Sequence, residues 1–258
     1  MELSKRLQAV ADMVTKGNAV ADVGCDHGYV SIYLMQQKIC PHVIAMDVNQ
    51  GPLLRAKEHI AQYCMTDYIE TRLSDGVTAL NIGEADTLIC AGMGGRLTMR
   101  ILEQGKDVTS AMKEWILQPQ SEIQCVREYI RERGFVICDE KMIYEEGKYY
   151  PIMKVSLSGG PVNSTIAEID KAENSADLLH RELADKFGPI LLQRKDAVLY
   201  DFLLEQQAQY EAILNALQQA VEQDKKQETD NTTDRRWRRM TEVEEELKSI
   251  RLAIGGIL

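Results

Sequence analysis

Seven short apolar runs, separated by amphipathic stretches, fill the first 157 residues and limit the folds open to this chain. Three of them, VIAMDV, DTLICAG and WILQP, are apolar at most positions, as is typical of parallel strands buried on both faces. We expect strands near residues 19–24, 42–48, 68–73, 85–91, 114–118, 134–143 and 149–157. We expect helices near residues 2–16, 28–38, 50–63, 94–105 and 121–133.

This alternation predicts an α/β fold with a doubly wound, Rossmann-like parallel sheet. The last two expected strands have no helix between them. The sequence EEGK, Glu145 to Lys148, is typical of a hairpin turn at that point. One of the two strands should therefore run antiparallel to the rest of the sheet.

The composition changes after SGGP, Ser158 to Pro161, which is a domain-boundary signal. We therefore divide the chain into residues 1–160 and a helical domain of residues 161–258. In the second part, apolar positions recur at steps of three and four on either side of a polar segment, Glu222 to Asp234. This spacing predicts an antiparallel coiled-coil hairpin, with Thr233 or Asp234 as the N-cap of its second helix.

Several functional classes find little support in the composition. No apolar run reaches the ~18–20 residues of a membrane span, and the N-terminal stretch contains acids unlike a signal peptide, so we expect a cytoplasmic protein. The six cysteines form no CxxC pair and the four histidines show no ligand spacing, so no metal is expected. The cysteines are expected to be mostly buried free thiols. The net charge of −10 argues against nucleic-acid binding through bulk charge, but RRWRR at 235–239 is a local basic cluster.

The stretch ADVGCDHGY, Ala21 to Tyr29, lies between an expected strand and an expected helix. Gly24 and Gly28 permit a tight turn and a close approach of ligand to backbone. Asp26 stands where a dinucleotide fingerprint has its middle glycine, and its charge would repel a pyrophosphate. A carboxylate there suits a cationic ligand such as the sulfonium and ammonium groups of S-adenosylmethionine. A tight turn without a ligand is the alternative.

Two further acids follow the next strands. Asp47, with Val48 beside it, lies at the distance where Rossmann-type folds place the carboxylate that binds ribose hydroxyls. Asp75 and Gly76 follow the third strand, where an acid can accept a bond from the adenine amino group; an ordinary Asp-Gly turn is the alternative. The fourth strand enters a glycine-rich loop with candidate donor-binding residues Ala91, Gly92 and Met93 and candidate acceptor-binding residues Gly94 and Gly95.

This loop lacks the N/D-P-P-Y/F motif with which many adenine and cytosine amino-methyltransferases hold an exocyclic amine. Together the motifs resemble those of the bacterial tRNA (adenine(22)-N(1))-methyltransferase family: DVGCDHGY, AMDV, LSDG, DTLICAGMGG and ILQPQ, followed by a helical hairpin. The resemblance implies a class I methyltransferase fold, with residues 1–160 as the S-adenosylmethionine-binding methyltransferase domain. It implies N1 of an adenine in the D-loop region of tRNA as the acceptor. It assigns site roles to Gly24, Asp26, Gly28, Asp47, Asp75 and the loop from Ala91 to Gly95.

Other candidates rest on position alone. Tyr29 and Gln118 are expected to contact the reacting base, and Gln120 and Tyr149 to bind the substrate; each is equally compatible with ordinary packing or a polar surface. The arginine cluster, defined as Arg235, Arg236, Arg238 and Arg239, is the candidate tRNA contact. Its alternative is a solvated helix face paired with nearby glutamates. Trp237 falls on the apolar stripe and is expected in the hairpin core.

Two alternative functions stay open. One is a methyltransferase of another RNA or of a small molecule. The other is a non-enzymatic coiled-coil interaction protein with a degenerate methyltransferase fold, which would not bind S-adenosylmethionine. Neither a membrane nor a protein partner is expected.

Overall fold

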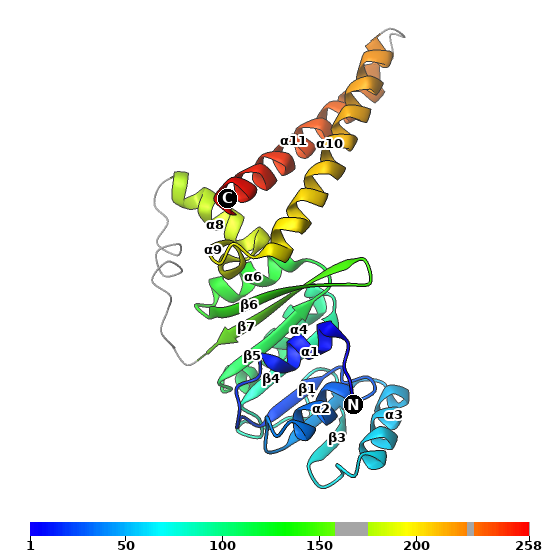
Figure 1. Cartoon of the computed structure of the whole chain (residues 1–258), viewed down its shortest axis with the longest axis vertical. Coiled ribbons are helices and arrows are strands. Elements are labelled where there is room, and N and C mark those ends of the chain that lie inside the picture. The colour runs from blue at the N-terminus through cyan, green and yellow to red at the C-terminus, as the bar shows by residue number, and fades with distance from the viewer. Residues whose placement is uncertain (158–174, 226–229, 258) are drawn as a thin grey trace. The chain divides into compact units, whose positions relative to one another are not determined.

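The computed structural model describes residues 1–157, 175–225 and 230–257 (Figure 1). The chain forms two compact units, Met1–Ile190 and Leu191–Leu258. This division lies well beyond the boundary expected at residue 160, because α8 (Ser175–Phe187) packs on the first unit. Residues 158–174, which include the SGGP boundary signal, lie outside the described residues.

The first unit is built on a seven-stranded sheet in the order β3-β2-β1-β4-β5-β7-β6. Its strands are β1 (Val20–Val23), β2 (Val43–Asp47), β3 (Ile69–Leu73), β4 (Thr87–Met93), β5 (Glu114–Pro119), β6 (Val136–Glu145) and β7 (Lys148–Ser156). The first five run parallel, and β7 is antiparallel to both β5 and β6. Glu146 and Gly147, both with positive φ, make the turn between β6 and β7. The expected strands and the antiparallel hairpin are confirmed.

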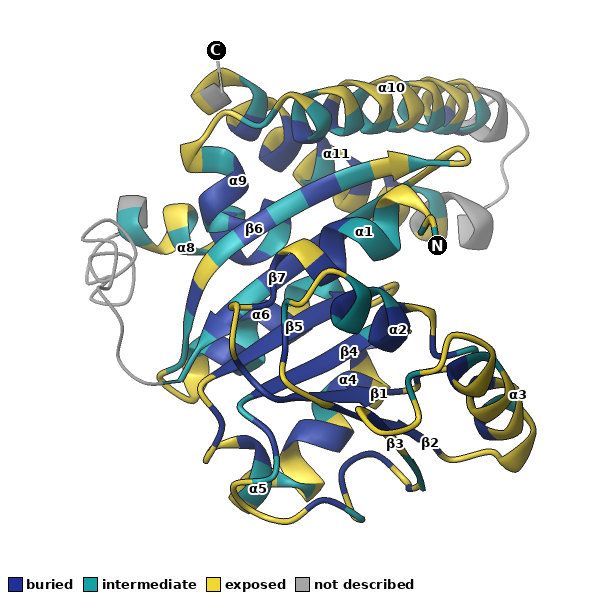
Figure 2. Cartoon of the chain, turned by 60° about the horizontal axis from the view of Figure 1, so that its bottom comes forward, coloured by how far each residue is buried: buried dark blue, intermediate teal, exposed yellow. Residues whose placement is uncertain are grey.

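Helices cover both faces of the sheet, because alternate residues of the buried strands point to opposite sides. Val20, Ile89 and Ile116 belong to one core cluster with α1 (Lys5–Asp12), α2 (Tyr29–Gln36) and α3 (Gln50–Gln62). Leu88 and Leu117 belong to a second cluster with α4 (Gly95–Gln104) and α6 (Ile123–Glu132). The central strands are dark blue along most of their length in Figure 2. A short helix, α5 (Lys106–Thr109), was not expected.

A buried ion pair attaches α8 and the start of α9 (Pro189–Gln193) to the sheet domain. Arg127 of α6 and Glu140 of β6 lie 2.9 Å apart and are almost inaccessible to solvent. Arg127 also donates to the carbonyls of Asp185 and Lys186, and Glu140 accepts from the Ile190 N–H at 2.9 Å. Two backbone carbonyls at the C-terminal end of α8 thereby accept hydrogen bonds from a side chain of α6.

The second unit contains two long helices, α10 (Ala197–Lys225) and α11 (Asp230–Ile257), which pack against each other as the expected hairpin. The stripe of α11 is buried from Met240 to Ile250, but Trp237 is 45% exposed, so its expected place in the hairpin core is wrong. Helix α11 begins at Asp230, which places Thr233 and Asp234 inside it rather than at its N-cap. Within the described ranges, none of the helices is both long enough and apolar enough for a membrane crossing.

The cysteines depart from the expectation that most are buried. Cys25, Cys40 and Cys90 are buried, whereas Cys64, Cys125 and Cys138 are exposed. Burial raises the pKa of the Cys40 thiol to about 12, so this thiol stays protonated and behaves as a small apolar side chain.

Candidate active site

The turn after β1 lies where the strand order reverses between β1 and β4, the position at which open α/β sheets bind ligands. The N–H groups of Gly24 and Cys25 both donate to the Met46 carbonyl, at 2.8 and 3.0 Å. The φ angles of Gly24 and Gly28 are +75° and +71°. A Cβ on Gly28 would lie 3.3 Å from the Cβ of Ala56, so glycine lets α2 start close to α3.

Gly24 also faces the last residue of β4. A Cβ built on Gly24 would lie 3.2 Å from Cε of Met93, and Gly24 itself is exposed. The two glycine-rich segments expected to bind the donor are therefore brought together across the switch point.

Asp26 presents an open carboxylate in this turn. Its side chain is 65% exposed; the Arg55 guanidinium lies 3.7 Å away and Nε2 of His27 lies 3.6 Å away. Both contacts are long and solvent-exposed, so they hold the carboxylate weakly. Asp26 is therefore available to a cationic group of a ligand.

Asp47 lies at the carboxyl end of β2 and is 8% exposed. One carboxylate oxygen accepts the N–H of Asn49 at 2.8 Å, and no described residue donates to the other. Val48 follows it with 58% of its surface exposed. A half-satisfied carboxylate beside an exposed apolar side chain suits a ribose with an attached flat ring.

A third acid close to Asp47, Asp22, was not a site candidate from the sequence. It is buried in β1 and accepts the Ser31 hydroxyl at 2.7 Å. Burial raises its pKa to about 6; the Ser31 bond opposes the shift and the charge of Asp47 adds to it. An acid inside an apolar strand was the available sequence signal.

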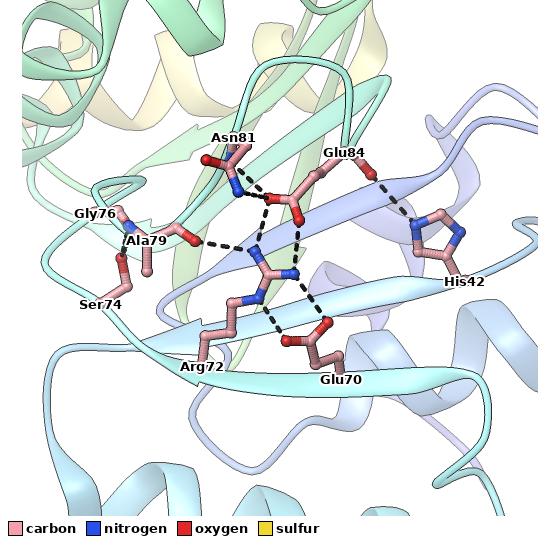
Figure 3. A network of polar contacts seen from close by, with 8 residues as sticks. All are labelled: His42, Glu70, Arg72, Ser74, Gly76, Ala79, Asn81 and Glu84. Atoms are coloured by element: carbon pink, nitrogen blue, oxygen red, sulfur yellow. Dashed lines mark hydrogen bonds and ion pairs between the residues drawn. The ribbon is translucent and has the colours of Figure 1, made fainter.

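The segment from Ser74 to Glu84 connects β3 to β4 without a helix and is held by a clasp centred on Arg72 (Figure 3). The Arg72 guanidinium donates to both oxygens of Glu84 at 2.7 and 2.9 Å, to both oxygens of Glu70 at 2.6 and 2.9 Å, and to the Ala79 carbonyl at 2.9 Å. Arg72 lowers the pKa of Glu84 to about 2, and bonds from Asn81 contribute. The clasp fixes the segment that carries Asp75.

Asp75 itself has an exposed side chain, and its contact with Arg100 is 3.4 Å long. The next residue, Gly76, has a φ of +60°, and Ser74 spans the turn by donating its hydroxyl to the Gly76 carbonyl at 2.9 Å. Asp75 is therefore accessible beyond the end of β3, the strand next to β2 and Asp47.

The segment from Ala91 to Gly95, expected as a loop, is the end of β4 (Ala91 to Met93), the N-cap Gly94 and the first residue of α4, and it forms a floor with few side chains. A Cβ on Gly95 would lie 2.5 Å from the Ser121 carbonyl oxygen, and the Gly95 N–H donates to that oxygen at 3.1 Å. The Gln120 N–H in turn donates to the Met93 carbonyl at 2.9 Å. Glycine is needed here because the start of α4 is in direct contact with the loop after β5.

Gln118 occupies a different place from the one expected. Its side chain is fully buried; its Oε1 accepts from Arg6 at 2.8 Å, and its Nε2 donates to the Pro119 carbonyl at 3.3 Å. Both ends of the amide are used, so Gln118 cannot contact the base directly as expected. Gln120 is exposed beside Gly92, with its Nε2 3.8 Å from a Cβ built there.

Tyr149 lies in the β6–β7 hairpin, where its ring packs 4.7 Å from that of Tyr144. Neighbouring strand residues point to opposite faces, and the next residue, Tyr150, is the one whose ring lies under the Arg6 guanidinium at 5.4 Å. Tyr149 therefore lies on the face of the hairpin opposite Arg6.

Tyr29, the first residue of α2, is 38% exposed and belongs to a group of stacked rings. Its ring lies 5.3 Å from that of His27 and 5.1 Å from that of His59. His59 Nδ1 lies 3.0 Å from the His27 carbonyl. The histidines fix the ring of Tyr29 at the crevice, and neither was a site candidate from the sequence.

The arginine cluster belongs to the second unit. Arg236 donates to the Ala220 carbonyl of α10 at 3.1 Å, and Arg239 pairs with Glu242 at 2.8 Å. Arg235 and Arg238 are exposed. Two members of the cluster thus have intramolecular roles. Across the described parts of the chain, no three His, Cys, Asp or Glu side chains are grouped to hold a metal ion.

The sheet order, the glycine turn at the switch point and the acids at the ends of β2 and β3 define a Rossmann-like methyltransferase. In agreement, the family described as "Methyltransferase domain" matches residues 3–153. The tRNA (adenine(22)-N(1))-methyltransferase of Bacillus subtilis strain 168 is 30% identical over 236 residues, which cover 91% of this chain and 94% of that protein.

Solved structures extend the comparison. The crystal structure of the B. subtilis m1A22 tRNA methyltransferase has a TM-score of 0.77 at 27% identity and covers 98% of this chain and 99% of that chain. A Streptococcus pneumoniae protein described as a putative tRNA (m1A22) methyltransferase, in complex with S-adenosyl-L-methionine, has a TM-score of 0.74 at 26% identity, covering 98% and 100%. This chain belongs to the tRNA (adenine(22)-N(1))-methyltransferase family.

Proposed function

We propose that this protein transfers a methyl group from S-adenosylmethionine to N1 of adenine 22 in tRNA. Besides the family, the observation that carries the proposal is the close approach of the turn at Gly24 to the end of β4, where a Cβ built on Gly24 would lie 3.2 Å from Cε of Met93. The carboxyl ends of the strands at the switch point are where such a sheet binds its ligand, so a methyl donor and a flat base can meet there. A tRNA substrate places the reaction in the cytoplasm, as expected from the sequence.

The residues present fit this donor. Asp47 has a free carboxylate oxygen for the ribose hydroxyls, Val48 offers apolar surface to the adenine, and Asp75 can accept from its amino group. Asp26 provides a negative charge near the methionyl end of the crevice. S-adenosylmethionine supplies a methyl group on a sulfonium, which is a good leaving group.

For this reaction the protein mainly has to position the methyl donor and the acceptor base. Adenine N1 has a free lone pair at neutral pH, so no general base is needed to create the nucleophile. Holding the two reactants in line can supply ~7–11 kcal/mol of the barrier reduction. The methylated ring is cationic, and the acids around the crevice favour that developing charge. Because N1 lies on the pairing edge, the adenine must reach the site unpaired or turned out of its stack.

Substrate binding has to overcome a net charge of −10. We assign part of the tRNA contact to the exposed members of the arginine cluster, Arg235 and Arg238. Tyr29 is the aromatic ring placed to stack on the base, and Gln120 is the exposed amide beside the glycine floor.

Methyl transfer from labelled donor to unmodified tRNA, followed by nucleoside analysis, tests the function. We expect N1-methyladenosine as the product. A transcript that carries 1-deazaadenosine at position 22 should not be methylated, because it lacks the accepting nitrogen. Methylation of that transcript at the parental rate would exclude N1 as the acceptor.

The same assay separates the alternatives. Methylation of ribosomal RNA or of free adenosine in preference to tRNA would identify another substrate class. A folded protein that fails to bind S-adenosylmethionine would support the non-enzymatic interaction protein.

A further inference from the structure

The guanidinium of Arg6, which comes from the N-terminal helix α1, lies beside the floor of the proposed methyl-transfer site. Its NH1 donates to Oε1 of the buried Gln118 at 2.8 Å, and its Cζ lies 5.4 Å from the centre of the Tyr150 ring. The same NH1 is only 3.5 Å from a Cβ built on Gly92, so it reaches the glycine-rich end of β4 itself. None of these contacts was foreseen from the sequence.

Gln118 and Tyr150 contact this guanidinium directly, and two further contacts fix the start of the helix that carries it. The Ser4 hydroxyl accepts the N–H of Leu7 at 3.3 Å and caps α1. Glu145 of β6 accepts the N–H of Lys5 at 2.6 Å and attaches the start of α1 to the β6–β7 hairpin. With Gln118 and Tyr150 these contacts hold Arg6 from three elements, so little side-chain entropy remains to be given up on binding.

Arg6 also differs from the other arginines around the crevice in its charge environment. Arg55, Arg96 and Arg100 each lie within 4.0 Å of a carboxylate, at 3.7, 3.4 and 3.4 Å. Within the part of the chain that the structure describes, Arg6 has no carboxylate partner; its hydrogen-bond partner is the neutral amide of Gln118. A preorganised cation without a counter-charge favours an incoming anion.

The chemistry of the two reactants limits which anions can bind Arg6. Arg6 cannot stabilise the methylated ring, because both would be cationic. Both reactants do carry oxyanions: the methionyl carboxylate of the donor and the phosphate next to the target adenosine. We infer that Arg6 is the oxyanion-binding residue of this site, held in place by Gln118. The inference rests on the proposed function for the identity of the two reactants.

Binding measurements on the full chain test the inference and identify the oxyanion. The variants are Arg6→Gln and Arg6→Lys, with Arg133→Gln as the matched control. Arg133 also lies over a tyrosine ring, that of Tyr129 at 3.6 Å, but near the C-terminal end of α6, away from the carboxyl ends of the parallel strands. Melting temperatures close to that of the parent establish that each variant is folded.

The first arm compares S-adenosylmethionine with decarboxylated S-adenosylmethionine by calorimetry. If Arg6 binds the methionyl carboxylate, Arg6→Gln should weaken S-adenosylmethionine about tenfold or more and leave the decarboxylated donor within about twofold of the parent. The second arm measures tRNA affinity at several salt concentrations. If Arg6 binds a phosphate, Arg6→Gln should lower the salt slope by about 0.7 to 0.9. Arg6→Lys should recover part of the affinity in whichever arm responds.

A folded Arg6→Gln protein that matches the parent in both arms would overturn the inference and leave Arg6 as a packing residue. Weaker binding in both arms together with an equal effect in Arg133→Gln would overturn it too, because the effect would then be one of general charge. Neither arm needs turnover. A parent that binds both ligands but yields no N1-methyladenosine would contradict the proposed function alone.

Discussion

Replacing Arg72 by Met should loosen the loop that carries Asp75 and should lower the stability of the sheet domain. Met keeps an unbranched stem but removes all five hydrogen bonds of the guanidinium. The Glu70 pair is exposed and contributes roughly 0.5 kcal/mol. The Glu84 pair and the Ala79 carbonyl are partly buried and contribute about 2 kcal/mol together. The total, about 2 to 3 kcal/mol, should lower the Tm by roughly 5 to 10 °C.

Differential scanning calorimetry measures the stability, and titration with S-adenosylmethionine measures the effect on the site. We expect weaker donor binding, since Asp75 no longer has a fixed position, and unchanged tRNA affinity. The matched control is Arg133→Met, which removes an exposed pair with Glu103 and should shift the Tm by no more than about 3 °C. An Arg72→Met protein that melts with the control and binds the donor like the parent would refute the reasoning.

The pH dependence gives this prediction a second measurement. The pKa of Glu84 is about 2 in the folded protein, below its ordinary value of 4.5, so Glu84 contributes stability above pH 4.5. That contribution is lost as the pH falls from about 4.5 towards 2. In Arg72→Met the main cause of the shift is absent, and the decline over this window should be shallower. An equally steep decline would show that Asn81 alone holds Glu84 ionised.

Three further outcomes follow from the site. Asp47→Ala should weaken S-adenosylmethionine binding by about 1.5–3 kcal/mol in calorimetry, and unchanged affinity in a folded variant would remove Asp47 from the site. The pKa of Asp22 is about 6 in the folded protein and 3.8 ordinarily, so the parent should lose about 3 kcal/mol of stability as the pH rises from 3.8 to 6. Asp22→Asn, followed by urea unfolding over the same pH range, should lack this loss. If the variant still loses stability over that range, the loss belongs to another group. Changing the whole arginine cluster to Gln should lower the tRNA salt slope by nearly 1 for each phosphate that the protein no longer neutralises, and a parental slope would support the solvated-face alternative.

The sheet could be predicted from the sequence because its signal is local. Strands such as VIAMDV and WILQP are apolar on both faces, and only a covered sheet accommodates such runs. The sequence gives no sign that α8 belongs with the first compact unit, because α8 is attached by Arg127 and Glu140, which are distant in sequence and look like surface charges. The stripe of α11 was recognised, but periodicity does not show how far the packing extends, so Trp237 was placed inside.

The site was foreseen where glycines and strand-end acids indicate it, at Gly24, Asp47 and Asp75. It was missed where a residue acts through a contact from a distant element. Gln118 looked like a base-contacting amide, and only the fold shows that its Oε1 is taken by Arg6. Asp22 lies within the glycine-turn motif, but its burial, which gives it an unusual pKa, depends on the whole sheet around it.

The attachment of α8 decides where this protein can be divided for study. A fragment ending at residue 157 or 160 would open the Arg127–Glu140 pair to water and remove the Asp185, Lys186 and Ile190 backbone groups that it bonds. It would also remove Ile190 from the core cluster on that side of the sheet. Gly188 is also a poor end point, because its φ is +102° and a Cβ built there would lie only 2.8 Å from a Glu140 oxygen, so no other residue fits at this position. A catalytic fragment should therefore extend past Ile190. If a shorter fragment failed to bind the donor, the cause would be the loss of the contacts that α8 makes with the sheet domain.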